Sequence, residues 1–408
     1  MPETDHRRAR PLELLADPDF RRLWLIGGVT GMVRWLDMIM TAVWVFDVTR
    51  SPGAVATVTF LRLLPMMGGA FAGALVERFP LRVVLRIGLG GLAAVYLAMT
   101  VLALAGLLTV WHAGIGAAAI GLYWATEMSV RRTMLGEIAG AARVGAAMGL
   151  DWSTINTMRL FGPLAGGAAY SAWGIGACYA ACFACFGLGC AITFGIRSGA
   201  SASAPRGGAV LAAIAAGIRT MAGHQVLKAT LAVTFALNFF GFAYTSMIPV
   251  IAKQELAAPP VLVGLLSSAE GIGALAGSFT IAALATPRLY GPAYVLGSLG
   301  LLCGAFVFSL SGTYWLSLLA LGLGGLGAAL FATMQSSLIL THAPPEGRSR
   351  LMGVLTTTIG IGQIGTLHVG LMATYLGAPV AVTVSTLEGI VLVTLAAWRW
   401  PRLWRGAG

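Results

Sequence analysis

The sequence predicts an all-α membrane protein with about twelve transmembrane helices, arranged as two pseudo-symmetric bundles of about six helices each. Three observations support this prediction: an apolar composition, a one-sided distribution of positive charge, and an internal repeat. Of the 408 residues, 58% are hydrophobic and only 10% are charged. A water-soluble domain carries about 25% charged residues. The composition therefore excludes a soluble protein, and the chain is long enough for about twelve crossings of about 20 residues each.

Apolar segments separated by short polar turns make up most of the chain. We assign residues 23–196 to a first bundle and residues 227–398 to a second. Residues 197–226, rich in Ser, Gly, Ala and Pro, are the expected cytoplasmic linker, and residues 1–22 and 399–408 are the expected cytoplasmic ends. The first two expected helices lie near residues 23–46 and 54–76, and the third ends near residue 110. The other nine lie near residues 112–135, 147–171, 178–196, 227–251, 261–285, 292–310, 314–341, 351–376 and 380–398.

Positive charge collects at the helix ends that fall on one side of the membrane in this topology. On the opposite side only Arg50 and Lys253 are expected. Because cytoplasmic loops carry an excess of Arg and Lys, we expect both chain ends in the cytoplasm and a location in the cell inner (plasma) membrane. The net charge of +11 thus indicates orientation. Nucleic-acid binding, which needs a basic patch on a soluble domain, is not expected.

The two halves of the chain repeat one another. A shift of 204 residues, half the chain length, superposes Gly69 on Gly273, Gly121 on Gly325 and Gly149 on Gly353. Parallel repeats of this kind are typical of transporters in which the substrate site lies between the halves, near the middle of the bilayer.

The turn between the second and third apolar segments carries a motif of glycine and charged residues. Four of its residues fit the pattern G-x-L-a-D-R-x-G-R-R: Gly73, Leu75, Arg78 and Arg82. Glu77 stands at the Asp position, whereas Pro80 and Leu81 depart from the pattern. This stretch resembles the signature loop between helices 2 and 3 of the major facilitator superfamily. The resemblance implies two six-helix halves of the major facilitator fold and a gating loop formed by Gly73, Glu77, Arg78 and Arg82.

Further motifs resemble one branch of that superfamily, the enterobactin-exporter and macrolide-efflux type of drug:proton antiporter. They are residues 19–24, 35–37, 49–52, 161–167 and 344–353. Residues 161–167 resemble the helix 5 motif of exporters, which implies that Gly162, Pro163, Gly166 and Gly167 bend a helix at the interface between the halves. Close packing of small residues is a compatible alternative. Helix 4 departs from the branch, with Ser129-Val130-Arg131 where Pro-Ala-Arg is usual.

Ionisable residues inside the apolar segments are the candidate functional groups, because each costs about 3 kcal/mol at the centre of a transmembrane helix. Arg34 and Asp37 are three residues apart on one helical face and can pair. We expect Asp37 to exchange a proton as substrate binds: a nearby Arg would keep it charged while paired and release it when the pair opens. A static ion pair that fixes the helix to its neighbours is the alternative.

The remaining candidates flank the same central path. Glu127 and Glu270 are possible second protonation sites, and Asn238 falls at the repeat position of Arg34. Arg62 and Arg159 are expected either to pair with carboxylates or to bind an anionic substrate, which leaves the charge of the substrate open. The predicted proton-coupling and central-cavity set is Arg34, Asp37, Glu127, Asn238 and Glu270.

The sequence contains no phosphate-binding P-loop, nucleophile–base pair or metal-ligand cluster, so we expect neither an enzyme nor a cofactor or metal site. The prediction is a secondary active transporter, a proton-coupled exporter of a small amphipathic, drug- or siderophore-like molecule that works by alternating access. Protons and membrane lipids are its other expected partners, and a monomer is its expected state. An importer or lipid transporter of the same fold, or a non-transporting membrane scaffold or sensor, are the alternatives.

Overall fold

The computed structural model describes residues 11–67, 79–140, 143–197, 219, 223–284, 287–342 and 348–405. Within these ranges every regular element is a helix. Most of the predicted linker lies outside the described residues, as do Gly73, Glu77 and Arg78 of the predicted gating loop.

In its described residues, the first half consists of a short 3-10 helix and five longer helices. They are η1 (Pro11–Ala16), α1 (Pro18–Thr49), α2 (Pro52–Met67), α4 (Leu81–Leu104), α5 (Val110–Ala139) and α6 (Val144–Thr193). The α1 helix begins where the side chain of Asp17 accepts hydrogen bonds from the backbone N–H groups of Asp19 and Phe20. It ends at Arg50, which takes a left-handed conformation with φ 53° and closes the last turn.

The α6 helix contains two crossings. Its backbone breaks at Gly174, where φ is 71°, a value that glycine adopts without strain. Before the break, Tyr170 contacts Asp47 near the end of α1. After the second part of α6, the carbonyl of Gly195 accepts a hydrogen bond from Arg22 near the start of α1. The second part therefore runs back along the first half.

The second half contains two crossings that are interrupted. One is α8 (Gln225–Ala236), followed by η2 (Leu237–Gly241), η3 (Phe242–Ser246) and α9 (Ile248–Gln254); the other is α13 (Arg348–Gly362) with α14 (Gly365–Leu376). The η2 segment is a π-helical turn, a feature frequent at functional sites. The remaining elements are α10 (Pro260–Leu284), η4 (Pro287–Leu289), α11 (Tyr290–Leu310), α12 (Tyr314–His342), α15 (Ala378–Arg399) and α16 (Arg402–Arg405).

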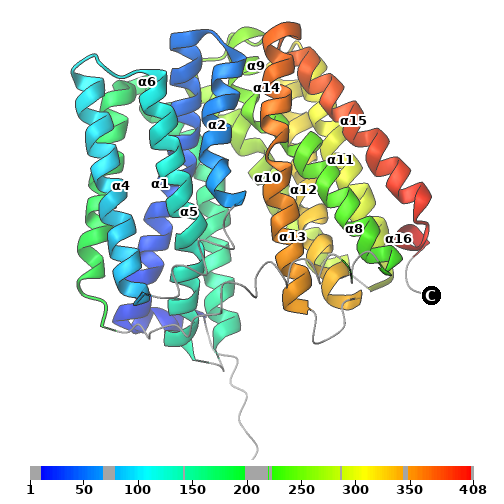
Figure 1. Ribbon diagram of the computed structural model, residues 1–408, viewed down its shortest axis with the longest axis horizontal. Coiled ribbons are helices and arrows are strands. Elements are labelled where there is room, and N and C mark those ends of the chain that lie inside the picture. Colours follow the sequence, from blue (N-terminus) through cyan, green and yellow to red (C-terminus); the bar gives the residue numbers. More distant parts are fainter. Residues whose placement is uncertain are drawn as a thin grey trace, which may run out of the picture.

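These elements form two helical bundles that lie side by side (Figure 1). Among the described residues, nine helices are long and apolar enough to cross a membrane. That number counts α6 once although it crosses twice, and it omits the shorter α2 and the more polar α5. With these included, the predicted fold class of twelve crossings in two bundles is confirmed.

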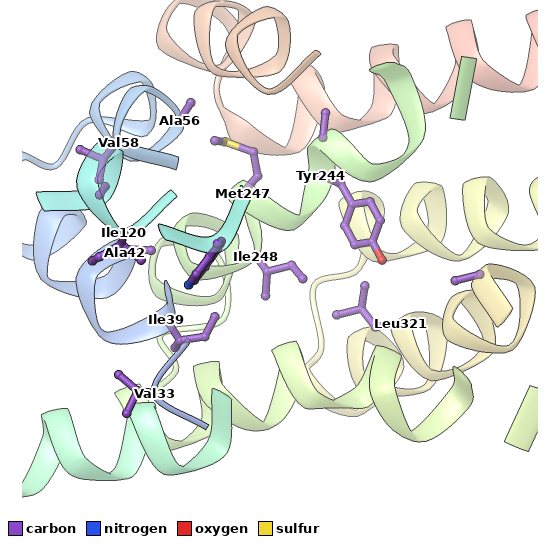
Figure 2. Close-up of a cluster of buried hydrophobic side chains, with 14 of the residues drawn as sticks. Val33, Ile39, Ala42, Ala56, Val58, Ile120, Tyr244, Met247, Ile248 and Leu321 are labelled. Atoms are coloured by element: carbon purple, nitrogen blue, oxygen red, sulfur yellow. The ribbon is translucent and has the colours of Figure 1, made fainter. Parts of the chain in front are cut away.

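The bundles contact each other mainly through α6 against α10 and α2 against α14. One cluster of buried apolar side chains extends through both halves. Figure 2 shows Met247 and Ile248 of the second half in the same cluster as Ile39 and Ala56 of the first. The interface is thus apolar where α1 and α2 approach the interrupted crossing α8–α9.

Candidate functional site

A wholly buried ion pair lies inside the first half. Asp37 of α1 is 0% exposed and Arg62 of α2 is 2% exposed, and the two side chains form a salt bridge. Thr41, one turn further along α1, donates a hydrogen bond of 3.1 Å to the other carboxylate oxygen of Asp37. The Thr41 hydroxyl is also 3.2 Å from the Tyr179 hydroxyl. Every oxygen of the carboxylate therefore has a partner away from water.

The predicted pairing of Arg34 with Asp37 is not formed. Arg62 reaches Asp37 from the neighbouring helix and satisfies its carboxylate inside the bundle. The Arg34 guanidinium lies instead over the ring of Trp124, 4.1 Å from its centroid, and 5.8 Å from the ring of Trp35. Residues three apart on a helix can meet, but here the carboxylate of Asp37 is bonded to Arg62 of α2 instead.

A second charged cluster joins α5 to α6 within the first half. Arg131 is 2% exposed and forms salt bridges to Glu127, one turn earlier on α5, and to Asp151 on α6. Arg132 donates to the other oxygen of Asp151 at 3.1 Å. The predicted protonation site Glu127 is thus already bonded to an arginine. We did not predict a role for Asp151, although a carboxylate between the apolar stretches of α6 was the available signal.

A small pocket adjoins the second cluster. It lies between α1, α5 and α6 and has a volume of ≈ 20 Å³, enough for about one water-sized group. Its polar and aromatic walls are Arg34, Trp35, Tyr123, Trp124, Glu127 and Arg131. Trp124 also lies 5.6 Å from the guanidinium of Arg62, so its ring touches both the pocket and the Asp37–Arg62 pair.

A third ion pair connects the two halves near their middle. Arg159 of α6 forms a salt bridge to Glu270 of α10. Tyr244 of η3 donates a hydrogen bond of 3.1 Å to the second oxygen of Glu270. The Arg159 guanidinium is also 5.5 Å from the ring of Trp35. Arg62 and Arg159 therefore both take the first of their two expected roles, which is pairing with a carboxylate.

The second half has a neutral polar core. Asn238 is buried in η2, and its amide donates to the carbonyl of Thr234 at 2.9 Å. Gln335 of α12 donates to the Thr234 hydroxyl at 2.8 Å, and that hydroxyl is 2.9 Å from the hydroxyl of Tyr294. These bonds link α8, α11 and α12 through uncharged polar groups.

The helix 5 motif places its small residues on two faces of α6. Gly162 and Gly166 lie against the backbone of α1, where a Cβ at Gly166 would meet Leu36. Pro163 and Gly167 lie against α10 of the other half: a Cβ at Gly167 would collide with the carbonyl of Pro260. The close approach requires glycine at position 167. The motif therefore packs α6 against α1 of its own half and against α10 of the other half.

A fourth polar contact lies at the helix ends that the charge pattern predicts to be outside, which we call the outer ends. Lys253 of α9 lies 2.9 Å and 3.2 Å from the two carboxylate oxygens of Asp47, at the end of α1. Tyr170 donates to the same carboxylate at 3.0 Å. This contact, like Arg159–Glu270, takes one partner from each half.

Of the predicted gating loop, only Arg82 falls within the described residues. It is exposed, and its guanidinium donates to the carbonyl of Arg197 at 3.4 Å. Among the described residues, this contact joins Arg82 to the first residue of the predicted linker.

Solved structures similar to this one cover nearly the whole chain at low sequence identity. One is a POT family transporter in complex with 5-aminolevulinic acid, with a TM-score of 0.76 and 11% identity over 94% of this chain and 96% of that chain. Another is the nucleoside transporter NupG, with a TM-score of 0.71 and 12% identity over 93% of this chain and 99% of that chain. A third is a bacterial homologue of the human lysosomal transporter Spinster, with a TM-score of 0.72 and 12% identity over 96% and 99% of the two chains. These likenesses show the fold.

No curated protein matches the chain. The sequence pattern of one family, described as transmembrane secretion effector, matches residues 9–403. With the twelve-crossing fold and its transporter neighbours, this match shows that the chain is a multi-pass membrane protein of the transmembrane secretion effector family, within the major facilitator superfamily of transporters.

Proposed function

We propose that this transporter is a proton-coupled exporter of a small amphipathic molecule, of the enterobactin-exporter and macrolide-efflux type that its sequence resembles. It would work by alternating access in the inner (plasma) membrane, as a monomer with both chain ends in the cytoplasm. The observation that carries the proposal is the Asp37–Arg62 pair, a carboxylate with no exposure in the middle of a transmembrane bundle.

The pair gives proton exchange a physical mechanism. While Arg62 is bonded to Asp37, the carboxylate is stabilised as an anion; when Arg62 moves away, an unpaired carboxylate in this apolar setting takes up a proton. Trp124 supplies the connection, because its ring contacts Arg34 at the pocket and lies 5.6 Å from Arg62. A substrate that displaces Trp124 would therefore disturb the pair.

The Arg159–Glu270 pair supports coupling between the proton and the movement of the halves. A proton on Glu270 would remove the charge that holds Arg159, and with it a bond from α6 to α10. The tightest approaches between these helices, at Gly167 and Gly264, are backbone contacts that permit rocking once the ion pair is released.

The alternatives differ in what they require of these charges. An importer or a lipid transporter of the same fold would use the same pairs, so only the direction and identity of the cargo distinguish it. A scaffold or sensor has no use for them, because removing each charge from water costs several kcal/mol. Buried pairs of this kind thus favour transport over a purely structural role.

The test uses the full chain reconstituted into vesicles that enclose a pH-sensitive dye, with an imposed pH gradient. A panel of amphipathic antibiotics and siderophores is added, and proton flux is recorded for the wild type, Asp37→Asn and the exposed control Arg399→Gln. We expect cargo-dependent proton flux in the wild type and control, and its loss in Asp37→Asn. No cargo-dependent proton flux, with Asp37→Asn indistinguishable from wild type, would favour the scaffold. Cargo-dependent flux that persists in Asp37→Asn would contradict the role of Asp37.

A further inference from the structure

Salt bridges join the arginines and carboxylates that lie inside the described bundles, with one exception. Asp37 is joined to Arg62, and Arg159 to Glu270. Arg131 and Arg132 are joined to Glu127 and Asp151. Arg34 remains: in the part of the chain that the structure describes, it forms no salt bridge and no hydrogen bond.

The neighbouring carboxylates are not available to Arg34. Asp37, on the same helix, is bonded to Arg62 and Thr41. Glu127, which shares the pocket with Arg34, is bonded to Arg131. The faces of Trp35 and Trp124 attract the guanidinium, but a neutral ring does not cancel its charge.

A guanidinium that has no salt bridge or hydrogen bond, and that faces a pocket inside a membrane bundle, is a candidate to bind an anionic group. On the basis of the function proposed above, we propose that Arg34 binds the anionic group of the substrate, and that the substrate is an aromatic carboxylate or a comparable organic anion. The two tryptophans provide flat apolar surfaces beside the charge, and the Arg34 fork provides the paired N–H donors that a carboxylate accepts.

The size of the pocket specifies which part of the substrate enters it. A volume of ≈ 20 Å³ accepts a group little larger than one water molecule. The anionic group alone would lie beside Arg34, with the ring of the substrate against Trp35 or Trp124. With the anion bound, Arg34 would have a hydrogen-bonded partner, as the other arginines of the first-half clusters do. A cation in the same place would face two arginines, Arg34 and Arg131, and one carboxylate, Glu127, so the site disfavours cationic cargo.

The proposal is tested by isothermal titration calorimetry on the purified full chain in lipid nanodiscs, without a proton gradient. Three probes of matched shape differ in charge: 1-naphthoate, 1-naphthamide and 1-naphthylmethylammonium. We expect the wild type to bind naphthoate at least about tenfold more tightly than the amide, and the ammonium probe not at all. Arg34→Gln should lose that preference, Arg34→Lys should keep part of it because the charge remains, and the exposed control Arg399→Gln should keep all of it.

Equal affinity for naphthoate and naphthamide in the wild type, no naphthoate binding, or an Arg34→Gln protein that retains the preference would overturn the proposal. Size-exclusion chromatography checks that each variant folds; if Arg34→Gln does not, a reduced preference in Arg34→Lys supports the proposal and an unchanged one contradicts it. Because binding is measured without transport, naphthoate binding with no proton flux would refute the exporter and leave the anion site standing. Proton flux driven only by cationic cargo would support the exporter and refute the anion site.

Discussion

The two halves share one fold but fill their interiors with different chemistry. A shift of 204 residues relates them, and Thr30 of the first half then falls on Thr234 of the second. The charged residues of the first half fall on neutral ones: Arg34 on Asn238, Asp37 on Gly241, Arg62 on Leu266, Glu127 on Phe331, Arg131 on Gln335 and Asp151 on Leu355. Ion pairs join helices of the first half, whereas the polar groups at these repeat positions of the second half form uncharged hydrogen bonds or are replaced by apolar residues. The second half also contributes Glu270 to the pair with Arg159, and it contains the partly exposed His368–Glu388 contact.

This difference shows that the fold itself does not require the charges. Gln335, 4% exposed, occupies the repeat position of Arg131, 2% exposed, and serves with one hydrogen bond to Thr234. Buried ion pairs stabilise little compared with apolar packing, because desolvation offsets their attraction. The roles in binding and coupling that we propose would account for these pairs, including the pair of Arg159 with Glu270 of the second half.

The largest expected effect compares those two repeat positions. Arg131→Gln leaves Glu127 unpaired and Asp151 with Arg132 alone, so we expect a loss of about 3–5 kcal/mol in the free energy of unfolding. Gln335→Leu removes one neutral bond, while Thr234 keeps Tyr294, so we expect about 1 kcal/mol. Thermal unfolding of both variants in the same detergent measures the difference. Equal losses would mean that the two interiors are energetically alike.

The next effect concerns the glycines of α6, which contact both halves. In Gly167→Ala the new Cβ meets the carbonyl of Pro260, and we expect α6 and α10 to separate at a cost of about 1–3 kcal/mol. Gly187→Ala, in the second part of the same helix, has no atom in the way and is the matched control, expected to be neutral or slightly stabilising. Unfolding temperatures that do not distinguish the two variants would contradict the close approach.

A smaller effect is expected at the outer ends. The side chains of Lys253 and Asp47 are 18% and 26% exposed, so water screens their attraction. We expect Lys253→Gln to cost at most about 1 kcal/mol of stability, and the loss to shrink as salt is raised. A salt-independent loss as large as that of Arg131→Gln would show that this contact, rather than the buried pairs, holds the halves together.

The smallest effect lies at the inner end of the second half. The His224 ring is 5.5 Å from that of His342. Partial burial, and then the charges of His342 and Arg402, lower the pKa of His224 below its ordinary value. The folded state therefore binds this proton less readily than the unfolded chain, so stability falls as pH drops from about 7 to about 5. His224→Gln should lose slightly less stability over that interval, measured by thermal unfolding. A variant whose acid sensitivity equals that of wild type would contradict the assignment.

The sequence predicted the architecture well, because bilayer-length apolar segments, one-sided charge and a half-chain repeat leave few other folds. The sequence also showed which ionisable residues lie inside the apolar segments of the first half. Apolar periodicity does not reveal where the interrupted crossings bend, since the π-helical turn at Asn238 and the break between α13 and α14 follow from packing between helices.

The partners of the charges were harder to predict. Arg34 and Asp37 satisfy the spacing of a helical pair, yet Asp37 bonds to Arg62, which lies 25 residues away on another helix. Asp151 joins Arg131 across 20 residues. Spacing along one helix shows which residues share a face. Which arginine pairs with a given carboxylate depends on how the neighbouring helices are rotated, and tertiary packing determines that rotation.

Removing the Asp37–Arg62 pair as a unit tests whether these two charges serve proton coupling rather than stability. The double variant Asp37→Asn/Arg62→Gln creates no additional unpaired charge inside the bundle, so it should fold with an unfolding temperature close to that of wild type. In vesicles with an imposed pH gradient, we expect this variant to carry cargo without moving protons. Proton-coupled transport at the wild-type level by the folded double variant would refute the proposed coupling role of the Asp37–Arg62 pair.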